Sequence, residues 1–319
     1  MSTLERVIDD LRPAHEPLDA EWSADTLTAI MAQPVRPKRR RRRLAVAATL
    51  VGVVTVPVML SGGSASARAE LLSLAVVAAR ADGPVITPGT YLHVRTESLQ
   101  VNSSVLGDGK RLDTNRESWT RWDGDMVAID TRPSAGWTEH HRFTHDPDDI
   151  GFGSPSPEFV ASLPDTPDAL RRYLDRTVSG SNSHEEALFV AISDLAYSRM
   201  LDPHTFATAL RVLADVRGVS TDDVEVDGRP AVEVQYDRFF GLGFVSRSSF
   251  TVDTETAQLL RMSETSPSSD YTSRTRSVEV VDEVPPEVLA DLDRYGNGSR
   301  ICTDGSEARD TESPEDTCS

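Results

Sequence analysis

The longest uninterrupted apolar pattern in the chain runs from residue 44 to residue 60 and contains no charged side chain. Six basic residues precede it directly: Lys38, Arg39, Arg40, Arg41, Arg42 and Arg43. At about 1.5 Å of rise per residue, a helix over residues 44–63 would reach roughly 30 Å, the thickness of a hydrocarbon core. A basic block beside an apolar run is typical of a transmembrane helix whose basic end lies in the cytoplasm. The pattern predicts such a helix within residues 38–63.

Two other interpretations of the run stay open. Ala65, Ser66 and Ala67 have the small–x–small form that a signal peptidase cleaves, so the run could be an export signal cut after Ala67. However, 43 residues precede it, far more than an ordinary signal peptide has. A buried core helix is the second alternative, but six cations would then lie at its mouth. We therefore expect a retained anchor.

Apolar residues at helical spacing predict two short helices in residues 1–37, which we expect on the cytoplasmic side. They are Leu4, Val7, Ile8 and Leu11 in the first helix, and Trp22, Leu27, Ile30 and Met31 in the second. Neither helix can bury enough surface to fold alone. The segment is either a loosely ordered tail or a docking element that lays an apolar face into a partner's groove.

The pattern changes after the apolar run, and residues 64–292 predict an extracytoplasmic domain. Alternation places Tyr91, His93 and Arg95 on one face of a strand and Leu92 and Val94 on the other. Other strands are predicted at 117–122, 125–130, 224–226, 231–236, 244–253, 258–265 and 274–284, and helices at 66–81, 167–174, 184–200 and 203–216.

Local capping signals support the helices, because Ser183 and Asp202 stand at two predicted helix starts. Residues 133–168 are rich in turn formers and predict a long loop, and Pro285–Pro286 is expected to end the last strand. Residues 293–319 are polar and acidic and predict a disordered tail. Strands, then helices, then strands indicate an α+β fold with an antiparallel sheet.

Charge separates the segments further. The net charge of −18 divides into −5 over residues 1–35, +7 over residues 36–43 and −20 over the remainder. A domain this acidic is not expected to bind nucleic acid, because phosphate contacts need cations. The basic block is expected to attract anionic lipid at the cytoplasmic face of the membrane. Both cysteines, Cys302 and Cys318, lie on the predicted outer side, where an oxidising compartment would allow a disulfide.

Candidate reactive groups are few. His140, His141 and His145 precede Asp146, Asp148 and Asp149, and these groups together could ligate a transition metal. The spacing matches no known metal site, and a solvated polar loop explains it. Ser154 and Ser156 lie among prolines and not in a nucleophile elbow. We therefore assign no catalytic, cofactor-binding or metal-binding residue, and an exported enzyme is the least favoured hypothesis. At most one of Trp119 and Trp122 can face a core, because the two are three residues apart on a strand.

Several motifs resemble a known family. They are the segment 88–96 (PGTYLHVRT), the segment 163–170 (LPDTPDAL), Gly218–Val219 with Asp227–Gly228–Arg229, and the segment 250–256 (FTVDTET) with Leu259–Leu260. This ordered set resembles actinobacterial single-pass membrane proteins of uncharacterised function, many of them encoded beside extracytoplasmic-function sigma factors. Leu11–Arg12–Pro13 in the tail is similar as well. The resemblance implies one transmembrane helix and a link to sigma factors, and it implies no catalytic residues.

Two functions fit this sequence. The first is a non-enzymatic membrane protein whose outer domain senses or binds a ligand and whose tail contacts a cytoplasmic regulatory protein such as a sigma factor. The chain lacks the histidine–cysteine motif of zinc anti-sigma factors, which argues against direct inhibition. The second is an anchored carrier or structural envelope protein. A curved sheet with helices on one face would resemble half-barrels of the lipoprotein-carrier type, which hold an apolar ligand between sheet and helices.

Overall fold

The computed structural model describes residues 65–102, 109–146, 151–179, 182–240, 244–307 and 318. The chain divides into two compact units, Met1–Pro57 and Val58–Ser319, and all described residues belong to the second. The predicted tail, the basic residues Lys38–Arg43 and the apolar run lie outside the described residues. Within the described part of the chain, no helix has the length and apolar character needed to cross a membrane.

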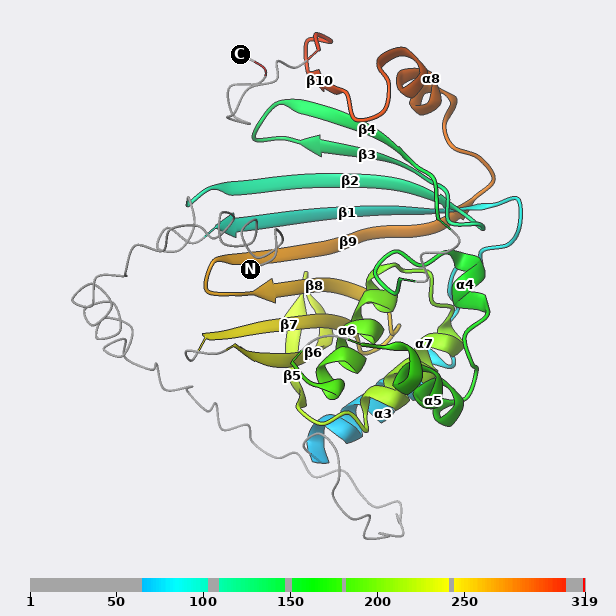
Figure 1. The fold of residues 1–319 in the computed structure, drawn as a ribbon, viewed down its shortest axis with the longest axis vertical. Helices are drawn as coiled ribbons and strands as arrows, with labels where there is room; N and C mark the ends of the chain where they lie inside the picture. Colours follow the sequence, from blue (N-terminus) through cyan, green and yellow to red (C-terminus); the bar gives the residue numbers. More distant parts are fainter. Residues whose placement is uncertain are drawn as a thin grey trace, which may run out of the picture. The chain divides into compact units, whose positions relative to one another are not determined.

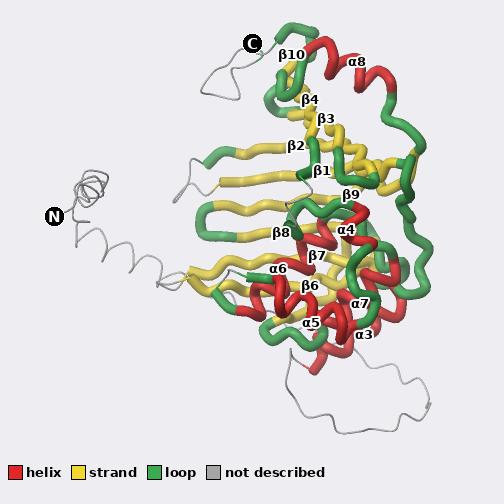
Figure 2. Tube along the Cα trace, turned by 45° about the vertical axis from the view of Figure 1, so that its right-hand side comes forward, coloured by secondary structure: helices red, strands yellow, loops and turns green. Residues whose placement is uncertain are grey.

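Ten described strands form one antiparallel sheet, which is curved (Figures 1 and 2). The strands are β1 (Tyr91–Asn102), β2 (Arg111–Arg121), β3 (Met126–Arg132), β4 (Trp137–Phe143), β5 (Val219–Val226), β6 (Arg229–Phe240), β7 (Phe244–Asp253), β8 (Leu259–Thr265), β9 (Ser269–Val281) and β10 (Arg300–Cys302). Their order is β10-β4-β3-β2-β1-β9-β8-β7-β6-β5. Most neighbours are consecutive in sequence, but β1 pairs with β9 and β4 pairs with β10. These two pairings join the early and late parts of the domain.

The described helices are α3 (Ala65–Ala78), α4 (Pro157–Ala161), α5 (Pro167–Thr177), α6 (His184–Tyr197), α7 (Pro203–Leu213) and α8 (Pro286–Tyr295). The first five gather over one face of the sheet, mainly over the β5–β9 half (Figure 1). The largest hydrophobic cluster lies between them and the sheet, where Leu188 and Ile192 of α6 and Leu210 of α7 meet Val234 and Phe250 of the strands. These five side chains are fully buried. The fold is therefore α+β, with most helices on one face, as predicted.

Strand alternation explains how the other half of the sheet is covered. Leu92 and Val94 of β1 point to the face that carries α6, where Met200 contacts their cluster. Trp119 of β2 points to the opposite face, where its cluster includes Val288 and Leu292 of α8. Tyr91 contacts this second cluster, so the predicted alternation along β1 is confirmed.

The capping predictions are confirmed for two helices. The Ser183 hydroxyl accepts a hydrogen bond from the Glu186 amide at the start of α6. The Asp202 carboxylate accepts hydrogen bonds from the His204 and Thr205 amides at the start of α7. These bonds satisfy amide donors that have no partner within the helix.

Two predictions between residues 133 and 319 are wrong. The expected loop over 133–168 contains β4 and α4. Strand β4 is short and mostly polar, so its sequence gives no clear alternation. The last strand ends at Val281, before Pro285–Pro286, as predicted, and Pro286 stands at the first position of α8, where its missing N–H costs nothing. The disorder expected over 293–319 is wrong at residues 300–302, which form β10 against β4. Local composition could not reveal this pairing.

Candidate functional site

A cavity of about 470 Å³ lies between the sheet and the end of α6, and we call it the sheet–helix cavity. Strands β1 and β2 form its floor, and residues 143–146, residues 153–155 and the residues that follow α6 form its walls. A volume of this size falls within the range of small-molecule sites, about 300–1,000 Å³. The space is therefore large enough for a small ligand.

The pleat of the sheet determines which side chains reach the cavity floor. Val94 and Thr96 of β1 alternate with Arg95, and Ser118 and Thr120 of β2 line the same floor. Register pairs Val94 with Ser118, so apolar and hydroxyl groups lie side by side. A floor that mixes both kinds of group suits a ligand with an apolar body and few polar atoms.

Apolar side chains also come from the walls. Met126 begins β3, Phe143 ends β4, and Met200 follows α6, and all three line the cavity. Methionine adapts its shape to irregular partners because its side chain is unbranched and polarizable. Phe143 is 42% exposed, so it offers apolar surface that the fold itself does not cover.

Two residues on this side of the cavity, His145 and Ser156, lie close to the β2–β3 turn. The His145 amide donates to Asp125 Oδ1 at 3.0 Å. At Gly124, φ is +94°, and a Cβ would lie 2.7 Å from His145 Cγ and 2.8 Å from Ser156 Cβ. Glycine is required there both for its backbone conformation and for the close approach of the wall.

One cation of the cavity is balanced within the protein. Arg116 Nε donates to Asp130 Oδ1 at 2.7 Å, and Nη2 donates to Oδ2 at 2.6 Å. This bidentate pair raises the pKa of Arg116, mainly through its hydrogen bonds to Asp130. His141 Nε2 lies 3.5 Å from the same carboxylate. The charge of Arg116 is therefore neutralised before any ligand binds.

Arg199 is the second arginine of the cavity and has different partners. Its Nη2 donates to Thr275 Oγ1 of β9 at 2.8 Å, and its Nη1 donates to the Tyr197 carbonyl. The guanidinium carbon lies 4.6 Å from the centroid of the Tyr197 ring. The Tyr197 and Tyr271 hydroxyls are 3.2 Å apart beside it. Burial raises the pKa of Tyr271 to about 12, so this hydroxyl stays neutral at physiological pH.

A smaller cavity of about 170 Å³ adjoins the other side of Arg199. Ala78 of α3, Phe206 of α7, and Leu259 and Val278 of the sheet line it, and Arg199 lines both cavities. Arg199 thus places a charged group between two partly apolar spaces.

The histidines considered from the sequence do not form one cluster. His140 and His141 are neighbours on β4 and point to opposite faces of the sheet: His140 lies 3.8 Å from Asp291 of α8, whereas His141 approaches Asp130. Burial lowers the pKa of His140, Asp291 opposes this shift, and His141 adds to it. His145 and Asp146 line the cavity, and Asp148 and Asp149 lie outside the described residues. Among the described residues, no three potential ligands gather at one point.

The serines and tryptophans also have structural positions. Ser154 lines the cavity, whereas the Ser156 hydroxyl accepts a hydrogen bond from Phe159 N at 3.0 Å and caps α4. Trp119 is buried and stacks on His93 with ring centroids 4.8 Å apart, and Trp122 is half-buried on the opposite face. The two tryptophans thus face opposite sides of the sheet, and only Trp119 is fully within a core, as the spacing predicts.

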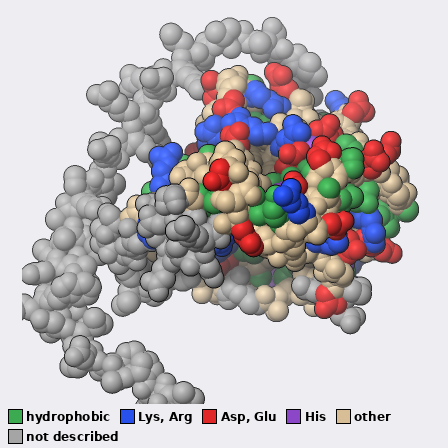
Figure 3. Space-filling model, turned by 90° about the horizontal axis from the view of Figure 1, so that it is seen from above, with side chains coloured by type: hydrophobic (Ala, Val, Ile, Leu, Met, Phe, Trp, Pro, Cys, Tyr) green, Lys and Arg blue, Asp and Glu red, His purple; other side chains and the backbone are tan. Residues whose placement is uncertain are grey.

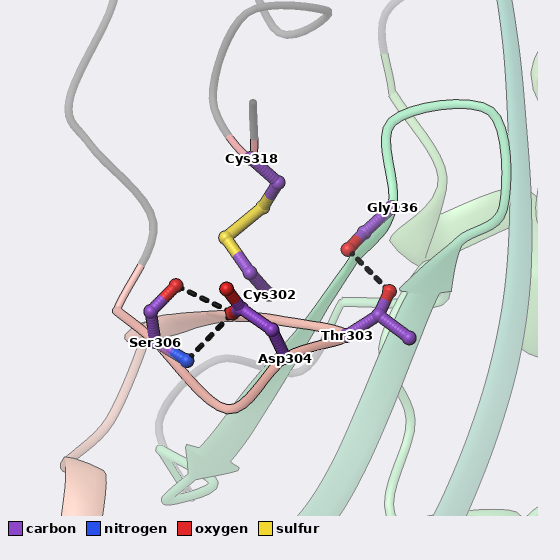
Figure 4. The surroundings of a disulfide bond; sticks show 6 residues. All are labelled: Gly136, Cys302, Thr303, Asp304, Ser306 and Cys318. Carbon is purple, nitrogen blue, oxygen red and sulfur yellow. Dashed lines mark hydrogen bonds between the residues drawn. A yellow bond between two sulfur atoms is a disulfide. The ribbon is translucent and has the colours of Figure 1, made fainter.

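The two cysteines form a disulfide at the edge of the sheet (Figure 4). Cys302 ends β10, and the Thr303 hydroxyl donates to the Gly136 carbonyl at 2.9 Å in the turn before β4. Asp304 accepts hydrogen bonds from the amide and hydroxyl of Ser306 in the following turn. The bond thus attaches the end of the chain to β10, far from the cavity in sequence and in the fold.

Charges of both signs cover the domain. In the view of Figure 3, Asp and Glu side chains are interspersed with Lys and Arg side chains. A nucleic-acid site needs a continuous basic stripe, which this face does not present. The face shown in Figure 3 therefore lacks the charge pattern of a nucleic-acid site.

Comparison with known proteins finds no matching family model and no matching curated protein. Among solved structures, a DUF1329 family protein from Desulfovibrio piger is 14% identical over 70% of this chain and 94% of its own, with a TM-score of 0.23. The Pseudomonas aeruginosa MucA/MucB complex is 10% identical over 70% and 60%, with a TM-score of 0.25. A LolA superfamily protein from Nitrosomonas europaea is 6% identical over 68% and 95%, with a TM-score of 0.22. Likenesses this low carry no argument about function, which must come from the geometry.

Proposed function

We propose that this protein is a non-enzymatic membrane protein whose outer domain binds an apolar or amphiphilic ligand in the sheet–helix cavity. The cavity of about 470 Å³ is the observation that carries this proposal. Its lining combines four large apolar side chains with several hydroxyl groups and with charged groups that include Arg199. The apolar side chains are Val94, Met126, Phe143 and Met200. A cavity that offers both kinds of group suits an amphiphilic ligand. Nothing in this lining forms a nucleophile–base pair, so binding is the activity that the geometry supports.

The proposal includes a topology. The run over residues 44–63 anchors the chain, the basic block Lys38–Arg43 contacts anionic lipid in the cytoplasm, and the described domain lies outside. The apolar positions within residues 1–37 favour a sensor over a simple carrier, because a pure anchor needs no amphipathic tail. The tail would then contact a cytoplasmic regulatory protein, such as a sigma factor.

Photocrosslinking of the full chain in its native membrane tests ligand binding. A neutral, diazirine-bearing dodecanol is added to membranes, irradiated and located by peptide mass spectrometry. We expect crosslinks on residues of the cavity, such as Met126 and Met200, that excess dodecanol suppresses. Crosslinks confined to other surfaces would contradict the proposal.

Two neighbouring substitutions on β1 provide a matched control. Thr96→Trp places a large ring on the cavity floor, and Arg95→Trp places the same ring on the opposite face of the strand. We expect Thr96→Trp to lower the crosslinking yield by about tenfold, and Arg95→Trp to leave it unchanged. Equal yields from both variants would contradict binding in this cavity.

A further inference from the structure

Arg199 stands where a glycine is the usual residue. Helix α6 ends at Tyr197 with Ser198 as its C-cap, and Arg199 follows with a φ of +59°. Residues other than glycine avoid this left-handed region because the Cβ crowds the backbone. A strained conformation at a cavity wall is most readily explained if the side chain has a task there.

The neighbours of the guanidinium group indicate its role. It contacts Thr275, the Tyr197 carbonyl and the Tyr197 ring, all of which are uncharged. Among the described residues, no carboxylate lies within ion-pair distance of Arg199, although Arg116 in the same cavity has Asp130. Arg199 is half-buried. A charge that is partly removed from water is ordinarily paired, because losing its hydration is costly.

Burial lowers the pKa of Arg199 to about 10, and the nearby hydroxyls of Tyr197 and Tyr271 oppose this shift. The side chain therefore keeps its positive charge at neutral pH. Its planar donors are arranged to bind two oxygen atoms of one anion. The apolar side chains that line the cavity beside it, such as Val94 and Met200, suit a hydrocarbon chain.

We infer that Arg199 binds the anionic head group of an amphiphile, a carboxylate or a phosphate monoester, whose hydrocarbon chain occupies the sheet–helix cavity. This inference rests on the proposed function and specifies its ligand class. Asp146 and His145 also line this cavity.

A set of probes of equal chain length tests the head-group preference. Dodecanoate, dodecyl phosphate and dodecanol compete against a diazirine-bearing dodecanoate for crosslinking to the full chain in membranes. We expect the two anions to compete at concentrations about tenfold or more below dodecanol, because a charge-assisted hydrogen bond is lost in the alcohol. Acetate and inorganic phosphate are added alone to test whether the head group suffices. We expect neither to compete, because they lack the chain.

Three variants assign the preference to Arg199. Arg199→Gln keeps a hydrogen-bond donor for Thr275 but removes the charge, and Arg199→Lys keeps the charge. Arg247→Gln removes a charge from β7, where Arg247 pairs with Asp237 of β6 and lines neither cavity. We expect Arg199→Gln to lose the preference for anions and to retain dodecanol binding, Arg199→Lys to keep part of the preference, and Arg247→Gln to leave it intact.

The possible outcomes separate the two proposals. If the anions and dodecanol compete equally, or if Arg199→Gln keeps the preference for anions, the inference about Arg199 is overturned while the cavity remains a binding site. If no amphiphile competes, the proposed function fails as well. Competition by free phosphate or acetate alone would show a site for small anions and would contradict the proposal that the ligand is an amphiphile. Retained dodecanol binding in Arg199→Gln serves as the folding control.

Discussion

At the scale of single residues, Gly124 shows how one missing side chain shapes the cavity. Its Cβ position is occupied by atoms of His145 and Ser156, and its φ is +94°. Gly89 has nearly the same φ, +95°, but no atom lies within 4 Å of its Cβ position. A side chain at either position would strain the backbone, but only at Gly124 would it also collide with neighbouring atoms.

We predict that Gly124→Ala destabilises the protein more than Gly89→Ala does. Both variants bear the cost of a left-handed alanine, about 1–2 kcal/mol. Gly124→Ala must also displace the cavity wall, which adds about 1–3 kcal/mol. Urea unfolding of the two variants measures the difference in free energy. Equal losses would show that His145 and Ser156 move away without cost.

Asp194 is a residue whose effect depends on pH. Burial raises the pKa of its carboxyl group, Arg238 opposes this shift and Glu264 adds to it. Between the ordinary value of 3.8 and the raised value, the folded state binds more protons than the unfolded state, so stability falls as pH rises through this window. Above the window the charged carboxylate is a constant burden.

We therefore predict that Asp194→Asn is more stable than the wild type at neutral pH and that this advantage vanishes below the ordinary carboxyl pKa. Urea unfolding across mildly acidic to neutral pH measures it. Asp223→Asn, at an exposed position of β5, serves as a control and should leave the pH dependence as it is in the wild type. A stability gain of Asp194→Asn that is the same at every pH would contradict the titration argument.

Residues differ in how far sequence could predict their roles. Ser183 and Asp202 were predictable as caps, because their partners lie within three residues along the chain. The role of Arg199 was not predictable. Its uncharged surroundings include Thr275 and Tyr271 of β9, which follow more than 70 residues later in the chain. A non-glycine residue after a helix gives no signal until the backbone is known.

At the scale of elements, β10 is the least expected part of the sheet. It pairs with β4, where Cys302 is opposite Trp137. Arg132 and Arg300 place their guanidinium carbons 5.3 Å and 4.9 Å from the centroid of the Trp137 ring. The disulfide holds the following segment to this small strand. Strands this short are seldom stable without such additional contacts.

We predict that reduction of the disulfide frees β10 from β4 and leaves the centre of the sheet intact. Cys302 and Cys318 are the only cysteines, so a reductant acts on this bond alone. Closing a loop of this length stabilises by about 3 kcal/mol in the chain-entropy model. Hydrogen exchange should accelerate at the β4 and β10 amides and stay slow in β1 and β9. Unchanged exchange in β10 would show that the tryptophan–arginine contacts suffice.

Elements differ in predictability for a physical reason. Strand β1 was predictable, because one face of it is apolar at Leu92 and Val94. Strand β4 carries Glu139, His140, His141 and Arg142 in succession, and its burial comes from α8 and β10 rather than from its own hydrophobicity. Polar strands at the margin of a sheet have no periodic signal of their own.

At the scale of the whole molecule, the α+β class followed from the order of strand and helix patterns, but the strand order did not. Hairpins such as β5–β6 join neighbours in sequence, and turn residues such as Asp227–Gly228 reveal them. The β1–β9 pairing brings together strands separated by most of the domain, and no local pattern encodes it. The cavity could not be derived from the sequence, because it lies between two elements, β1 and the end of α6, that only this topology brings together.

The same scale includes the proposed anchor, and here the arrangement of α3 bears on the choice between anchor and cleaved signal. Helix α3 begins at Ala65, and Ala67, the last residue before the cleavage point considered, is buried. Leu71, Leu74, Ala75 and Ala78 of the same helix belong to the main hydrophobic core. A peptidase that acts on extended chain would have to cut this helix before it docks.

We predict that the full chain stays intact and remains in the membrane fraction after an alkaline wash. An apolar helix within the bilayer resists this wash, whereas proteins bound to the surface only by charge are released. Protease added to cells with a permeable outer envelope should degrade an epitope within residues 64–319 and spare one within residues 1–37. Deleting residues 44–63 should release the chain from the membrane. Replacing Lys38–Arg43 by glutamine should leave the chain in the membrane, but with a fraction of the molecules in the opposite orientation. A released fragment that begins near residue 68 would instead establish cleavage, and the cytoplasmic tail would then have no path by which to respond to a ligand in the cavity.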